Sequence, residues 1–152
     1  MKSKKKMFIG RRIFRLLRAP LSINFSFISR WKNPKTSRII KGKSRGVSSK
    51  GLCLETEIDV RHGVLEFSET EGTEKEKVLP YLILSEKEIE LELNLPPGGN
   101  KTHIMGKPIW YELTSGESTS RLKICVLFKA MPREVLNNWL GYIKHADSPR
   151  TS

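Results

Sequence analysis

The residues best suited to chemistry in this sequence are arginines near its N-terminus. Arg11 and Arg15 are separated by three residues, in an RxxxR spacing, and Arg12 follows the first of them. A planar guanidinium donates paired hydrogen bonds to phosphate oxygens and to the acceptor edge of guanine. If these residues formed a helical turn, the side chains of Arg11 and Arg15 would point in the same direction, because they are four positions apart. In a loop, the two side chains could bind a ligand from two sides. The spacing therefore favours binding of a phosphate-bearing ligand.

A second polar group follows about thirty residues later, in the stretch RGVSSKG at positions 45–51. The hydroxyl of Ser48 could donate to a phosphate or a base, and Gly51 allows close approach of another backbone. Arg45 and Lys50 flank these residues and add positive charge. A turn serine and a bulge glycine in a solvated basic segment are the alternative interpretation of the same pattern.

The charge of the chain is divided unevenly. The net charge is +12, yet residues 1–50 contain 16 Lys and Arg and no Asp or Glu, whereas the remaining residues contain 12 Lys and Arg and 16 Asp and Glu. A field of this kind attracts phosphates on a nucleotide, a nucleic acid or an anionic membrane. The basic start has no uninterrupted apolar stretch and no small-residue cleavage site, and no run is long enough to span a bilayer. We therefore expect a cytoplasmic protein without a transmembrane segment.

The sequence contains none of the common catalytic or metal-binding signatures. It has no P-loop, GxGxxG, HExxH or GxSxG pattern, and its histidines have no ligand spacing to a cysteine. We expect no enzymatic activity, no cofactor and no metal. Cys53 and Cys125 each lie in an apolar alternating run and are predicted to be reduced thiols buried in the core.

Hydrophobic alternation predicts a mainly β fold. A period of two is clearest in LSINFSFIS (21–29) and EIELELNL (88–95), which are therefore predicted as strands. Further strands are expected at 36–44, 51–58, 103–113 (broken near Gly106 and Pro108) and 121–130. In the stretch 60–84, VLEF and YLIL are each predicted as a short strand, and the connection at 45–50 is predicted as a tight polar loop.

Two helical segments are expected at the ends of the chain. Residues 11–18 are predicted to form one or two helical turns that end at Ala19-Pro20. A C-terminal amphipathic helix is predicted to open near Met131-Pro132. Its apolar face is expected to consist of Val135, Leu136, Trp139, Leu140 and Ile143.

The order of these elements favours a small antiparallel β-barrel of six or seven strands with a helix packed at one end. We expect a flexible basic arm over residues 1–10, a barrel domain over 11–146 with an insertion at 60–84, and a disordered tail over 147–152.

With these elements in place, the sequence resembles the PilZ domain family of cyclic di-GMP receptors, which act in bacterial motility, pilus and exopolysaccharide control. The family is marked by RxxxR on an N-terminal switch loop and by D/N-x-S-x-x-G on the barrel. Arg11 and Arg15 match the first motif, and Ser48 and Gly51 match the second. Gly46 departs from the family, where an Asp or Asn side chain is expected to bond the guanine edge. The resemblance extends from about residue 11 to residue 145.

The resemblance implies a non-enzymatic receptor in which cyclic di-GMP orders the arginine arm on the barrel and alters the surface shown to a partner. The ligand residues would be Arg11, Arg15, Ser48 and Gly51, flanked by Arg12, Arg45, Gly46 and Lys50. The partner would belong to motility, pilus or polysaccharide machinery, and the protein would be a monomer or homodimer. Two alternatives stay open. One is a PilZ-type adaptor that binds no nucleotide, because Gly46 lacks a side chain, and the other is a basic nucleic-acid-binding barrel.

Overall fold

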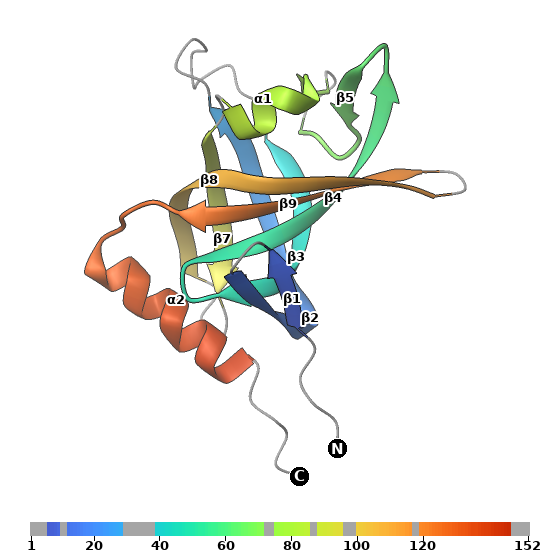
Figure 1. The fold of residues 1–152 in the computed structure, drawn as a ribbon. Coiled ribbons are helices and arrows are strands. Elements are labelled where there is room, and N and C mark those ends of the chain that lie inside the picture. Colours follow the sequence, from blue (N-terminus) through green and yellow to red (C-terminus); the bar gives the residue numbers. More distant parts are fainter. Residues whose placement is uncertain are drawn as a thin grey trace.

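The computed structural model describes residues 6–9, 12–28, 39–71, 75–85, 88–95, 100–116 and 119–146, and these ranges are mainly β-strand with two helices (Figure 1). The elements are, in chain order, β1 (Lys6–Ile9), β2 (Arg12–Ile28), β3 (Ile40–Ser48), β4 (Gly51–Arg61), β5 (Val64–Phe67), β6 (Lys77–Val78), α1 (Pro80–Ser85), β7 (Glu88–Leu95), β8 (Asn100–Ser115), β9 (Ser120–Phe128) and α2 (Arg133–Ala146).

The strands close into an antiparallel barrel. β2 pairs with β7 on one edge and with β3 on the other, and the path β7, β8, β9, β4 returns to β3, which closes a ring of six strands in the described ranges. β1 extends the sheet beside the first residues of β2, and β5 and β6 extend it beyond β4. The predicted mainly β, antiparallel barrel with a C-terminal helix is confirmed.

The barrel core follows the alternation that the sequence predicted. Leu21, Ile23, Phe25 and Phe27 of β2 are all buried, because successive strand residues point to opposite faces. The rings of Phe25 and Phe27 meet edge to face, with 5.7 Å between their centroids, and the Phe67 ring of β5 lies 5.4 Å from that of Phe27. The segment predicted as an insertion therefore contributes to the core.

The N-terminal segment differs from its prediction. Residues 12–18 belong to β2 and do not form helical turns, because β1 pairs with them from Lys6 opposite Arg15 to Ile9 opposite Arg12. Pairing satisfies the backbone groups of this segment, which a helix of one or two turns would leave largely without partners. Lys6–Ile9 lie within the predicted arm, so part of that arm is strand.

The prediction of a strand at YLIL was wrong, because these residues form most of α1. Pro80 opens this helix, where its fixed φ suits the first turn and its missing N–H costs nothing. Ile83 is fully buried while Tyr81 is 64% exposed. Four consecutive apolar residues show no period, so the sequence alone does not separate a short strand from a helix here.

Two smaller differences concern β8 and α2. β8 runs without interruption from Asn100 to Ser115, and the predicted break is a register shift between Pro108 and Trp110. In α2, Leu140 is exposed, whereas Tyr142 packs against the core in its place.

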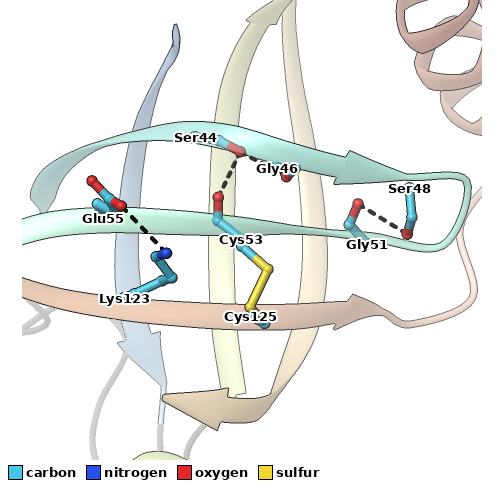
Figure 2. Close-up of a disulfide and its surroundings, with 8 residues drawn as sticks. All are labelled: Ser44, Gly46, Ser48, Gly51, Cys53, Glu55, Lys123 and Cys125. Carbon is cyan, nitrogen blue, oxygen red and sulfur yellow. Dashed lines mark hydrogen bonds and ion pairs between the residues drawn. A yellow bond between two sulfur atoms is a disulfide. The ribbon is translucent and has the colours of Figure 1, made fainter. Parts of the chain in front are cut away.

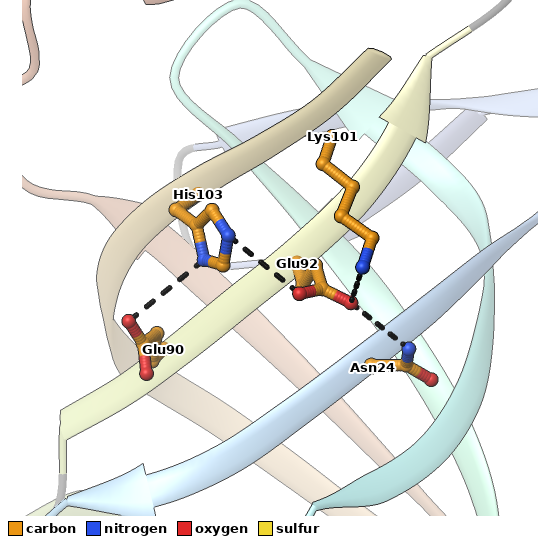
Figure 3. Close-up of polar contacts among 5 residues, drawn as sticks. All are labelled: Asn24, Glu90, Glu92, Lys101 and His103. Carbon is orange, nitrogen blue, oxygen red and sulfur yellow. Dashed lines mark hydrogen bonds and ion pairs between the residues drawn. The ribbon is translucent and has the colours of Figure 1, made fainter. Parts of the chain in front are cut away.

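The outer face of β2, β7 and β8 carries a row of polar side chains (Figure 3). Asn24 donates a hydrogen bond of 3.1 Å from Nδ2 to Oε1 of Glu92. Lys101 Nζ and His103 Nε2 lie 4.0 and 3.6 Å from oxygens of the same carboxylate, whereas Glu90 is approached only by His103, at 3.9 Å, in the part of the chain described. Glu92 therefore links three strands on the outside of the barrel.

Replacing Glu92 tests this link. We expect Glu92→Ala to lower the free energy of unfolding by about 1 kcal/mol, because Asn24 loses its acceptor. Glu90→Ala is the matched control on the same face and should cost less than about 0.5 kcal/mol. Urea denaturation of both variants measures the difference, and equal losses would contradict the assignment.

Candidate functional site

The second motif lies in the hairpin that joins β3 and β4. β3 continues to Ser48, so only Ser49 and Lys50 form the turn, which is tighter than the predicted connection at 45–50. The Ser48 hydroxyl donates to the Gly51 carbonyl oxygen at 3.4 Å (Figure 2). It also accepts from the Lys50 amide at 3.3 Å. The serine that was predicted to bind a ligand also stabilises its own turn.

Gly51 begins β4 at a close approach of two strands. It pairs with Leu127 of β9, and a Cβ atom built on Gly51 would lie 2.1 Å from the carbonyl oxygen of Val126. No side chain fits at this distance. The close backbone approach predicted for Gly51 is therefore explained by packing within the barrel.

β2 brings Arg15 to the same end of the barrel. Arg15 and Leu16 pair with Val47 and Gly46 of β3, so the two motifs, distant in sequence, lie on neighbouring strands. Arg15 Nη2 donates a hydrogen bond of 3.1 Å to the carbonyl oxygen of Ile143, in the last turn of α2. The last four carbonyls of a helix lack partners within it, and a cation is favourable at this end of the helix dipole.

α2 contacts both motifs. Trp139 is fully buried and donates a hydrogen bond of 2.9 Å from Nε1 to the carbonyl oxygen of Ser48. Its ring meets Phe128 edge to face at 5.1 Å and lies 5.6 Å from the ring of Tyr142. Burial raises the pKa of the Tyr142 hydroxyl above its ordinary value. Arg15 on one side and Ser48 on the other therefore hold the same helix.

Cys53 and Cys125 form a disulfide between β4 and β9, which corrects the prediction of reduced thiols (Figure 2). Their burial was predicted correctly, since they are 3% and 0% exposed. The two cysteines are 72 residues apart and lie directly opposite each other in the strand register. Only the pairing of β4 with β9 brings the two sulfurs together, and their sequence context gave no sign of it.

Ser44 was missed by the sequence reasoning. Its buried hydroxyl donates a hydrogen bond of 2.7 Å to the Cys53 carbonyl oxygen, and the Gly46 carbonyl oxygen lies 3.0 Å from it (Figure 2). The register of β3 against β4 shifts between Ser44 and Gly46. Ser44 therefore satisfies backbone carbonyls at the irregularity that precedes the motif.

Arg45 lies apart from these contacts, in a groove across the outer faces of β2, β3 and β4. The groove has a volume of about 440 Å³. Its charged lining residues are Lys41, Lys43, Arg45, Arg121, Glu55, Glu57 and Glu69. One of these residues, Glu55, also forms an ion pair of 3.7 Å with Lys123 of β9 (Figure 2). Because the lining mixes both signs, the groove does not give the uniformly positive track that a nucleic acid backbone favours.

The remaining predicted ligand residues are placed as follows. Arg11 lies outside the described residues, and Arg12 is described only as the first backbone position of β2, opposite Ile9. Gly46 is buried within β3, and Lys50 is exposed in the turn.

Within the described ranges, no helix is long and apolar enough to cross a membrane. In the same ranges, no three His, Cys, Asp or Glu side chains gather in a way that could hold a metal ion.

Comparison with known proteins gives one match among solved structures. No family model and no curated protein matches the chain. The chain is similar to the Borreliella burgdorferi PlzA protein, whose crystal structure was determined in complex with c-di-GMP (cyclic di-GMP). The TM-score is 0.44 and the sequence identity is 16%, over 86% of this chain and 47% of the PlzA chain. The chain thus spans less than half the length of that protein.

The close approach at Gly51 predicts a large cost for a single methyl group. We expect Gly51→Ala to lower the free energy of unfolding by at least about 2 kcal/mol, because the added Cβ meets a backbone oxygen that cannot move alone. Gly141→Ala is the matched control. It adds the same methyl group on exposed α2, where nothing lies within 4 Å, and should add about 0.5–1 kcal/mol to the stability. Chemical denaturation of both variants is the measurement, and a tolerated Gly51→Ala would mean that the strands lie further apart.

The raised pKa of Tyr142 predicts a loss of stability in alkali. The folded state retains the phenol proton above the ordinary pKa of 10.0, so the free energy of unfolding falls as pH rises from that value through the folded pKa. Tyr142→Phe should make this fall shallower. Urea denaturation between neutral pH and pH of about 11 measures the slope in the wild-type protein and in the variant. The same slope in both proteins would contradict the prediction.

Proposed function

We propose that this protein is a non-enzymatic PilZ-type receptor for cyclic di-GMP. The observation that supports it best is the pairing of Arg15 and Leu16 with Val47 and Gly46, which sets the arginine motif beside the Ser48 hairpin. In the family that the sequence resembles, these two motifs together bind the ligand. An arginine motif distant from the hairpin would have counted against the proposal.

The chemistry of the hairpin end suits such a ligand. Cyclic di-GMP is a dianion with two guanines, and a guanidinium pairs with either a phosphate or the guanine acceptor edge. Arg15 would supply this group, together with Arg11 and Arg12 earlier in the motif. The Ser48 hydroxyl and the exposed Lys50 would add donors from the turn.

Ligand binding at Arg15 would be an exchange of partners. Its guanidinium donates to a neutral carbonyl of α2, whereas a phosphate offers a charge-assisted bond of roughly twice the strength. Binding would therefore draw the part of β2 that carries Arg15 toward the ligand and change the contact between β2 and α2. We propose that this altered surface is read by a protein partner in motility, pilus or polysaccharide machinery, in the cytoplasm.

Calorimetric titration tests the receptor function. At about 150 mM salt, where long-range surface charge is screened, we expect saturable binding of cyclic di-GMP and none of GTP. Arg15→Ala should weaken binding at least about tenfold, the loss of one charge-assisted hydrogen bond. Arg121→Ala removes an equal charge at an exposed position of β9 and is the matched control, in which the affinity should be unchanged.

The same titration decides between receptor and adaptor. Gly46 offers no side chain to the guanine edge, which favours the adaptor. A folded protein that gives no heat with cyclic di-GMP would overturn the receptor proposal and leave an adaptor that acts through protein contacts. Equal weakening by Arg15→Ala and Arg121→Ala would show that only overall charge attracts the ligand.

A further inference from the structure

The first residues of β2 cover the disulfide. Phe14 packs against Cys53 and Cys125 in a cluster separate from the barrel core, with Ile109 and Trp110 at its margin. Phe14 and Cys125 are 0% exposed and Cys53 is 3% exposed. Neither sulfur is therefore open to solvent while Phe14 is seated.

Phe14 and Arg15 are neighbours on one strand, so their side chains leave its opposite faces. Phe14 packs on the disulfide, and Arg15 reaches the last turn of α2. Since the two residues share a backbone, a displacement of Phe14 also displaces Arg15. The environment of the disulfide is thus coupled to the position of the arginine.

We propose that the redox state of the Cys53–Cys125 disulfide controls how firmly the first residues of β2 are held in place. We call the disulfide a redox latch, and residues 12–16 of β2 the arm. With the disulfide formed, the cluster seats Phe14 and holds the arm in register with β3. Reduction unseats Phe14 and loosens the arm. The consequence for ligand affinity at Arg15 rests on the proposed receptor function, whereas the latch itself does not.

The latch opens by thiol–disulfide exchange with a dithiol reductant. A thiolate of the dithiol attacks one protein sulfur, the bond between Cys53 and Cys125 breaks, and a mixed disulfide forms. The second thiol of the reductant then displaces the remaining protein sulfur. The protein gains two electrons and two protons as two thiols, and the dithiol leaves as its own disulfide.

Packing explains why reduction would loosen the arm. Two thiol sulfurs cannot remain at bonding distance and must separate to van der Waals contact, about 3.5–4 Å. Phe14, Cys53 and Cys125 are almost fully buried, so the added volume acts as overpacking. At Phe14, β2 pairs only with the four-residue β1 in the described ranges, whereas Cys53 and Cys125 each pair with a strand on both sides, so Phe14 gives way most easily. In the cytoplasm, where we propose the receptor acts, disulfides are typically transient or redox-sensing.

The first experiment needs no cyclic di-GMP. The protein oxidised in air should have a mass lower by two hydrogens than the reduced protein. Reduction with dithiothreitol for set times, each stopped by a large excess of maleimide that alkylates the reductant and the protein thiols alike, then gives the rate at which the two thiols appear. We expect Phe14→Ala to raise this rate about tenfold or more, which corresponds to about 1.4 kcal/mol in the free energy of opening.

The matched control is Phe67→Ala, which removes an equally buried ring from the barrel core. This variant should react at nearly the wild-type rate. Equal acceleration in both variants would show that the sulfurs are reached by global unfolding, and it would overturn the latch. A protein whose mass does not change on reduction would overturn it as well.

The second experiment tests the coupling to the ligand. Cyclic di-GMP should shift the thiol–disulfide equilibrium of the protein toward the disulfide, and the reduced wild-type protein should bind it several-fold more weakly, because the coupling of two equilibria is reciprocal. Equal affinity of both redox forms would overturn the coupling and leave the receptor function intact. If neither form binds, the receptor function fails, while the rate in Phe14→Ala still decides the latch.

Discussion

The pairing of β2 with β3 determines the arrangement at the end of the barrel that carries Arg15 and the hairpin between β3 and β4. It occurs in two stretches, Phe25–Leu21 against Ile40–Ser44, and Leu16 and Arg15 against Gly46 and Val47. Between them, four residues of β2 (17–20) face one residue of β3. The irregularity includes Pro20, which cannot donate to a ladder. Without this shift, Arg15 would not lie opposite Val47, and the arginine motif would meet a different part of the barrel.

The groups at this end already have partners within the protein. Arg15 donates to α2, the carbonyl of Ser48 accepts from Trp139, and the Ser48 hydroxyl bonds across its own turn. A ligand would therefore replace bonds instead of filling vacancies, so its affinity would be smaller than the sum of its new contacts. The same exchange would allow a bound ligand to alter the contact between Arg15 and α2.

Alternation of apolar and polar residues was sufficient to predict the strands that have one face in the core, such as residues 21–28 and β7. It was insufficient at residues 12–18, where Phe14 and Leu17 are both buried and no period of two is visible. The disulfide and the contacts of α2 depend on segments 72, 91 and 128 residues apart. Local patterns carry no information on such pairings. The residues within each motif are close in sequence, so both motifs could be found from the sequence. The contacts of Arg15 and Ser48 with α2 could not be found in this way.

Gly46 lies between the first residues of β2 and the strand that carries Cys53. It is buried in β3 and pairs with Leu16 of β2 on one edge and with Cys53 of β4 on the other. Because strand side chains project from the faces of the sheet, a glycine here links β2 and β4 through its backbone and offers no side chain to a ligand. In the receptor proposed above, recognition of guanine would therefore fall to other side chains, such as the guanidinium of Arg15.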